Sequence, residues 1–333
     1  MAGYKDIIGN EQIKEHLKNA ITLQRVSHAY IFNGDKGMGK KMVSGTFVMA
    51  LQCEKGLAEP CMECRSCRQI LSGSQPDVKY ITHEKPGVIS VDEIREQINN
   101  DIQIKPYSSR YKIYVMDEAE KMNVQAQNAL LKTIEEPPEY AMIILLTSNS
   151  EIFLPTILSR CVSLNMKPLN NAQIKDYLMR SMGFPDYQAD VVAAFAGGNL
   201  GKAIRLASSE DFNEIKNSVI HLLEYIGDME TYEVVLAVKQ AEKFKVDIED
   251  YIDLMMVWYR DVLMFKVSRD MNSLTFKDEY IYIKKQAEKI SFNGVEEILK
   301  AMDKAKVRLR ANVNFDLAIE MMYLTIRDGL NGR

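Results

Sequence analysis

The chain has 333 residues, of which 47% are apolar and 26% are charged, with 17 glycines and 9 prolines. At about 150 residues per domain this length favours two or three domains, and the composition excludes disordered and collagen-like proteins. The formal net charge of −4 argues against a chain that grips nucleic acid through an overall positive charge, so any contact with DNA must be local or shared with partners.

No stretch of the sequence approaches 18 consecutive apolar residues, and the first residues lack the apolar core of a signal peptide. We therefore expect a cytoplasmic protein. The acidic excess lies after about residue 207, which separates a charge-balanced N-terminal part from an acidic C-terminal part.

The part from residue 4 to about 165 alternates short apolar runs with helical patterns. The apolar runs predict strands over 28–32, 78–81, 112–116 and 142–147. Ser90 and Glu93 form a capping box at a helix start, and a second helix is expected from about 123 to 135, before Pro137. Nearly continuous apolar strands with helices between them predict an α/β fold with a parallel sheet.

After Pro168 the strand signals end. Residues 170–207 are typical of a small helical unit with a break at 197–199, and only long helical patterns follow from 211. One apolar stripe at helical spacing is interpreted as core packing. It consists of Ile248, Ile252, Met255, Met256 and Tyr259.

A glycine-rich segment follows the first predicted strand and opens a helix. Gly34, Gly37 and Gly39 let backbone N–H groups curve around phosphates, and Lys40 is placed to reach the β- and γ-phosphates. Lys41 stands where a Ser or Thr hydroxyl normally binds Mg²⁺. The segment therefore predicts a nucleotide phosphate loop that lacks one metal ligand, although a plain strand-to-helix turn is the alternative.

Polar residues follow two later strands. Asp117 comes at the end of the 112–116 run, where it would hold Mg²⁺, and Glu118 would polarise an attacking water. Asn149, after the 142–147 run, is a candidate sensor of the γ-phosphate. The alternatives are ordinary charges at a helix N-terminus and an ordinary turn.

Four of the five cysteines fall within fifteen positions. Cys53, Cys61, Cys64 and Cys67 offer four thiolates, which suit a closed tetrahedral Zn²⁺ site with a structural role. The alternative is a group of free buried thiols. Cys161 stands apart and is interpreted as packing.

Arg160 follows the fourth predicted strand in the segment Ser159-Arg160-Cys161. Two interpretations stay open from the residues alone. The side chain is either an ordinary surface ion-pair partner or an arginine finger that projects into a neighbouring subunit's nucleotide site.

Together these motifs resemble those of the AAA+ clamp-loader subunits of bacterial DNA polymerase III. The resemblance rests on motifs between residues 4 and 207, and on helical character alone after that. Residues 7–11 are similar to the family's opening box, 28–32 to its first core strand, 117–120 to its Walker B segment, and 159–161 to its arginine-finger motif. Residues 128–138, NALLKTIEEPP, form a string that recurs in clamp loaders.

The resemblance implies an AAA+ P-loop domain at residues 1–166 with a zinc module at 53–67, a helical lid at 167–207 and a helical collar at 208–333. It also implies a subunit that helps ATP-dependent loading of the sliding clamp onto primed DNA, with Arg160 acting in trans as the finger. The implied partners are the delta and tau or gamma subunits, the clamp and primer–template DNA. ATP or ADP would bind at the phosphate loop.

The sequence departs from the family's pattern at three places. Lys41 replaces the metal-binding hydroxyl, and Gly201 stands where an active ATPase lid presents Arg. The spacing after Cys53 is one residue shorter than usual. The first two departures favour a non-motor subunit, a weak ATPase at most, with Mg²⁺ binding in doubt.

Two alternative functions remain. Lys40, Asp117 and Glu118 favour an ATP-hydrolysing motor subunit of the tau or gamma type. A nucleic-acid-binding zinc protein is the other, although few cations flank the cysteines. A basic run could touch DNA, but is more typical of a solvated helix face. It comprises Lys300, Lys304, Lys306, Arg308 and Arg310.

Overall fold

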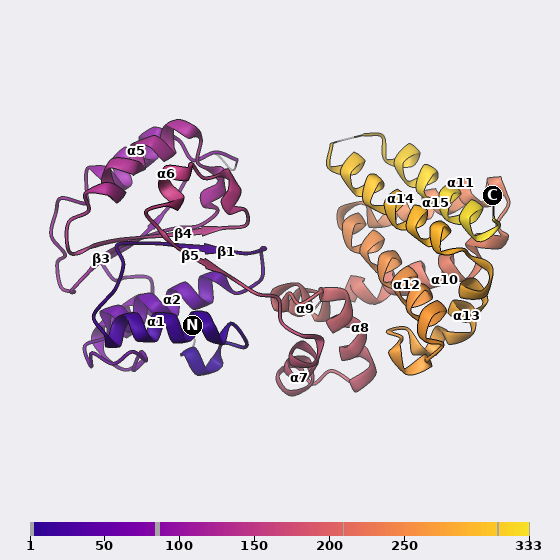
Figure 1. The fold of residues 1–333 in the computed structure, drawn as a ribbon, viewed down its shortest axis with the longest axis horizontal. Helices are drawn as coiled ribbons and strands as arrows, with labels where there is room; N and C mark the ends of the chain where they lie inside the picture. Colours follow the sequence, from indigo (N-terminus) through magenta and orange to yellow (C-terminus); the bar gives the residue numbers. More distant parts are fainter. Residues whose placement is uncertain (1–2, 84–86, 209, 312, 333) are drawn as a thin grey trace. The chain divides into compact units, whose positions relative to one another are not determined.

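A computed structural model describes residues 3–83, 87–208, 210–311 and 313–332 (Figure 1). The chain divides into two compact units. The first comprises residues 1–170 with 199–201, and the second comprises 171–198 with 202–333. The expected boundary between a lid and a collar near residue 207 stays a prediction.

The first unit is built on a five-stranded parallel sheet with the strand order β2-β3-β4-β1-β5. The strands are β1 (Ala29–Asn33), β2 (Val78–Ile81), β3 (Lys112–Met116), β4 (Ala141–Thr147) and β5 (Val162–Asn165). The first four lie where the apolar runs predict them. The sequence analysis missed β5 because Leu164 is the one buried residue among its four, so the strand has no continuous apolar run.

Helices cover both faces of this sheet, α1 and α2 on one face and α5 and α6 on the other (Figure 1). Alternate residues of β1 serve the two faces: Tyr30 and Phe32 pack with α1 and α2, whereas Ala29 and Ile31 pack with α5. The helices are α1 (Glu11–Thr22), α2 (Lys40–Gln52), α3 (Arg65–Leu71), α4 (Val91–Ile94), α5 (Val124–Glu135) and α6 (Pro155–Leu158).

Two predicted helix starts are confirmed in the first unit. The Ser90 amide donates to Glu93 Oε2 at 2.6 Å, and the Glu93 amide donates to Ser90 Oγ at 3.4 Å, which completes the capping box of α4. The helix continues as a π turn over Arg95–Asn99. Helix α5 begins after Asn123, whose Oδ1 accepts from the Ala126 amide at 2.8 Å.

The second unit is helical throughout its described residues. Trp258 lies in the helix that contains the predicted apolar stripe. It is fully buried and donates from Nε1 to Gln286 Oε1 at 2.9 Å. The helices are α7 (Asn171–Met182), α8 (Asp186–Ala196), α9 (Leu200–Ala207), α10 (Glu210–Tyr225), α11 (Thr231–Ala241), α12 (Ile248–Ser268), α13 (Tyr280–Lys289), α14 (Phe292–Arg310) and α15 (Phe315–Leu330). None of the helices in the described ranges combines the length and apolarity needed to cross a membrane.

Asp101 makes the first unit sensitive to acid. Burial alone would raise the pKa of this carboxyl, but hydrogen bonds from Lys112, Lys79 and Tyr114 outweigh it and lower the pKa from 3.8 to about 2. Because the folded pKa lies below the unfolded one, the stabilisation is complete above about pH 4 and is lost as the pH falls through 2. The difference corresponds to about 2 kcal/mol.

We therefore expect the free energy of unfolding to fall by about 2 kcal/mol more in the wild-type chain than in Asp101→Asn between about pH 5 and pH 2. Urea unfolding of both proteins across this range measures the difference. Parallel pH profiles for the two proteins would show that Asp101 does not contribute in this way.

Candidate functional site

The predicted phosphate loop lies between β1 and α2. Gly34, Gly37 and Gly39 have φ values of 155°, 95° and 88°, and Gly39 is the N-cap of α2. Residues with a Cβ rarely adopt positive φ, so glycine is favoured where the loop turns towards the helix N-terminus. Lys40 Nζ donates to the Gly34 carbonyl and, at 3.1 Å, to that of Asp35. Burial lowers the pKa of Lys40, against the opposing effect of nearby carboxylates.

Lys41, one residue further along α2, reaches across to the end of β3. Its Nζ lies 2.7 Å from Asp117 Oδ2. Asp117 is the carboxylate expected to hold Mg²⁺, and Lys41 stands where the metal-binding hydroxyl is expected. An ion pair therefore joins the two positions that would hold the metal ion in a complete phosphate site.

Glu118 is also engaged by neighbouring cations. It has a positive φ of 50°, and its carboxylate pairs with Lys121 and lies 3.8 Å from His83 Nε2. The hydrogen bond from Lys121 lowers the pKa of Glu118. The sequence analysis did not select Lys121 or His83, because neither belongs to a motif; the spacing of three between Glu118 and Lys121 is the one available signal.

The loop and the ends of β3 and β4 enclose a cavity of about 590 Å³. Its volume is in the range typical of small-molecule sites. Gly34 and Asn149 are not among its described lining residues; Asn149 Oδ1 instead accepts from the Glu151 amide at 2.9 Å. The lining residues are Lys36, Gly37, Gly39, Lys40, Lys41, Met42, Asp117, Glu118, Glu120, Leu146, Thr147 and Ser148.

Gly201 lies directly against the phosphate loop. Its amide donates to the Gly37 carbonyl at 3.0 Å, and a Cβ added at Gly201 would stand 2.6 Å from Gly37 Cα. Any larger residue at position 201 would push these backbones apart. Lys202, the neighbouring cation, pairs with Asp253 at 2.8 Å within the second unit.

Arg160 lies on the short connection from α6 to β5 and is not among the residues that line the cavity. Its guanidinium pairs with Glu135 Oε1 at 3.1 Å and donates to the Thr156 carbonyl at 3.0 Å. Both side chains of the ion pair are about 40% exposed, with values of 39% and 45%. The structure therefore places an exposed, oriented guanidinium on the surface of the first unit.

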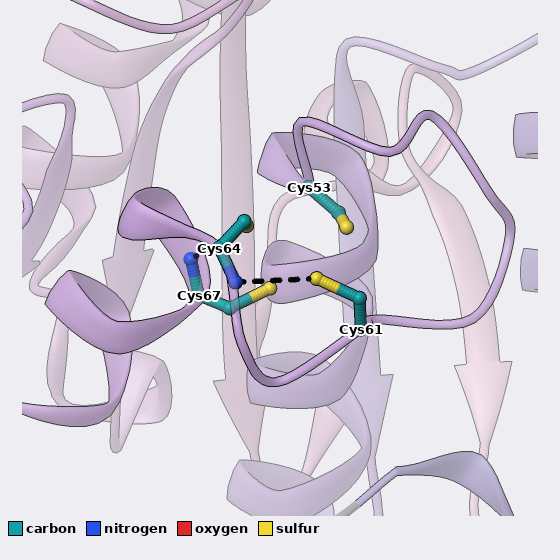
Figure 2. A group of neighbouring side chains, drawn as sticks. All are labelled: Cys53, Cys61, Cys64 and Cys67. Carbon is teal, nitrogen blue, oxygen red and sulfur yellow. Dashed lines mark hydrogen bonds between the residues drawn. The ribbon is translucent and has the colours of Figure 1, made fainter.

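The four clustered cysteines come together in space. Cys53 directly follows α2, Cys61 and Cys64 lie on the connection to α3, and Cys67 lies in α3. Their Sγ atoms all lie within 4.8 Å of one another, and Figure 2 shows the sulfurs of Cys53, Cys61 and Cys67 turned towards one another. The shortened spacing does not keep Cys53 out of the cluster.

The thiols of the cluster differ in environment. Hydrogen bonds from backbone amides, including that of Cys64 at 3.4 Å, lower the pKa of Cys61 to about 6. Burial raises the pKa of Cys53 and Cys67. Cys161 packs against the core on the α5 face, as predicted, and burial raises its pKa to about 12.

Comparisons with known proteins agree with this architecture. The family described as "DNA polymerase III, delta subunit" matches residues 9–170. DNA polymerase III subunit delta' of Bacillus subtilis is 30% identical over 322 residues, which cover 96% of each chain. The chain belongs to the family of DNA polymerase III delta' subunits. DNA polymerase III subunit tau of B. subtilis is 27% identical over 92% of this chain and 58% of the relative.

A solved structure is similar to this delta' family member as well. It is a DNA polymerase III gamma-subunit-related protein from Thermotoga maritima, with a TM-score of 0.44 and 22% identity over 95% of this chain and 99% of the other.

The basic run of the family member's C-terminal part is largely neutralised within the second unit. Lys306 pairs with Asp253 at 2.6 Å, and Arg310 binds Glu249 through two nitrogen atoms at 2.7 and 2.8 Å. Lys300 pairs with Glu296 on the same helix. These pairs favour the interpretation of the run as an ordinary helix face, with Lys300 and Arg310 largely exposed, over a contact with DNA.

Proposed function

We propose that the chain is a non-motor subunit of a DNA polymerase III clamp loader. In this role it helps ATP-dependent loading of the sliding clamp onto primed DNA, beside delta and tau or gamma subunits. Its own phosphate site does not turn over ATP, whereas Arg160 completes the ATP site of a neighbouring subunit. Membership of the delta' family supports the assembly, and the Lys41–Asp117 ion pair carries the non-motor assignment.

The residues of the phosphate site do not fit Mg²⁺. The hydroxyl ligand is replaced by Lys41, and Asp117 already has an ammonium 2.7 Å from its carboxylate. A cation repels a second cation at the same carboxylate, and a phosphoryl transfer site relies on the metal to neutralise developing charge. Glu118 is held by Lys121 as well, so the group expected to polarise water is engaged elsewhere.

Arg160 is suited to act in trans because it is exposed and weakly held. Exposed ion pairs such as Arg160 with Glu135 contribute only about 0–1 kcal/mol. A guanidinium can exchange such a partner for a phosphate at little cost, and its planar donors match phosphate oxygens. The contact with the Thr156 carbonyl limits the directions in which the side chain extends.

We further propose that Cys53, Cys61, Cys64 and Cys67 bind a structural Zn²⁺. With Zn–S bonds of about 2.3 Å, tetrahedral ligands stand about 3.8 Å apart. The observed spread within 4.8 Å needs only small movements to reach that geometry. The metal would fix the segment from α2 to α3, which has little regular structure before α3. Of the three cations near the cysteines, Lys55, Arg65 and Arg68, Lys55 pairs with Glu63 at 3.2 Å, which leaves fewer positive charges for a nucleic-acid-binding finger.

The competing assignment is a motor subunit, which the preserved Lys40 and the enclosed cavity favour. Phosphate release by the purified full-length chain separates the two. We expect no release above that of the Lys40→Ala variant, because the charge-neutralising metal has no site. Turnover in the wild-type chain that disappears in Lys40→Ala would establish the motor assignment instead.

A further inference from the structure

We propose that the cavity beside the phosphate loop binds the polyphosphate group of a nucleotide without a divalent metal, with the Lys41 ammonium in the place of Mg²⁺. The proposal rests on the proposed non-motor function and adds what the site does in place of hydrolysis. The ligand is a nucleoside 5′-di- or triphosphate in its metal-free form.

The position of the Lys41 ammonium carries this proposal. Lys41 belongs to the first turn of α2, and its Nζ lies 2.7 Å from Asp117 Oδ2, so one positive charge stands between the helix N-terminus and the end of β3. In a metal-dependent phosphate loop a hydroxyl at this helix position and an acidic residue after the neighbouring strand share one Mg²⁺. Here the lysine is both the occupant of the ligand position and the cation.

Three lysines and three carboxylates line the cavity, and they come from different elements: the lysines from the phosphate loop and the start of α2, and Asp117, Glu118 and Glu120 from the segment after β3. Lys36, Lys40 and Lys41 line the cavity together with the glycine-rich loop. Two of the lining carboxylates already have cationic partners: Asp117 pairs with Lys41, and Glu118 pairs with Lys121. An incoming Mg²⁺ would meet the like charge of the Lys41 ammonium beside Asp117, whereas an incoming polyphosphate meets lysine side chains and loop N–H groups.

The ion pair is also able to rearrange. The Lys41 side chain is 73% exposed and that of Asp117 is 39% exposed, so water screens their attraction. The ammonium can thus contact a phosphate oxygen while it stays near Asp117. Lys40, which donates to the Gly34 and Asp35 carbonyls, has to turn from these acceptors towards the ligand.

The test is equilibrium binding of fluorescent ADP and ATP analogues to the full-length chain, each with Mg²⁺ and with EDTA. For the better-bound nucleotide we expect wild-type binding to be no tighter with Mg²⁺ than with EDTA, because Mg²⁺ complexes the nucleotide in solution and lowers the concentration of its metal-free form. Lys41→Thr supplies the missing hydroxyl and frees Asp117, so its binding should become at least about tenfold tighter with Mg²⁺ than with EDTA. The double variant Lys41→Thr/Asp117→Asn should lose that difference.

Lys36→Thr is the matched control, because it removes one positive charge from the same cavity without touching Asp117. It should weaken binding equally with Mg²⁺ and with EDTA. Three results would each overturn the proposal: no nucleotide binding by the folded wild-type chain, wild-type binding that requires Mg²⁺, or no gain of metal dependence in Lys41→Thr. None of these results would contradict the proposed role of Arg160, because that role is measured separately in the assembled complex.

Discussion

Cys64→Ser should release the metal ion and lower the thermal stability of the protein substantially. Structural zinc sites contribute about 10–16 kcal/mol of apparent binding free energy in small peptides, and a site reduced to three thiolates retains only part of it. A loss of several kcal/mol corresponds to a fall in the melting temperature of about 10 °C or more. Metal content by mass spectrometry and thermal unfolding with and without a chelator measure both effects.

Two features of the structure make this comparison specific. Cys64 is the N-cap of α3 and accepts from the Cys67 amide, a role that serine fills well, so the substitution removes a ligand and keeps the cap. Cys161→Ser is the control, because Cys161 lies outside the cluster. Native protein without zinc, or equal zinc in the two variants, would contradict the assignment.

The strands show how far a pattern of apolar residues predicts a fold. Residues 141–147 form a strand that is buried along its whole length, and their unbroken apolar run predicts it. The sheet's edge strand β5 has alternating burial and polar residues at Ser163 and Asn165, so the same criterion misses it. Apolar continuity detects strands covered on both faces, and an edge strand needs its neighbour β1 to be identified.

The candidate site also contains features that the sequence predicts and features that only the fold shows. Close spacing along the chain predicts the cysteine cluster, because three of its cysteines belong to one short segment. The pairing of Lys41 with Asp117 joins residues from α2 and the end of β3, and only the parallel order of the strands brings them together. Asn149 caps the short helix that follows β4, a local role that its residue type also predicts, and its sensor role stays a prediction.

Arg160→Ala is expected to have the largest effect on activity. An arginine finger stabilises charge on the transferring phosphoryl group and accelerates turnover by about 10³–10⁵ at the site that it serves. The DNA-stimulated ATPase rate of the clamp-loader complex should therefore lose the contribution of the one ATP site that Arg160 serves. The isolated variant should unfold like the wild type, because the exposed pair with Glu135 contributes only about 0–1 kcal/mol.

The most direct test of the proposed function compares Arg160→Ala with Lys40→Ala in the reassembled complex on primed DNA with the sliding clamp. Both variants remove one cation from this chain, but from different places, the exposed connection after α6 and the phosphate loop. We expect a reduced ATPase rate with Arg160→Ala and an unchanged rate with Lys40→Ala. An unchanged rate with Arg160→Ala, or a loss confined to Lys40→Ala, would contradict the proposed function.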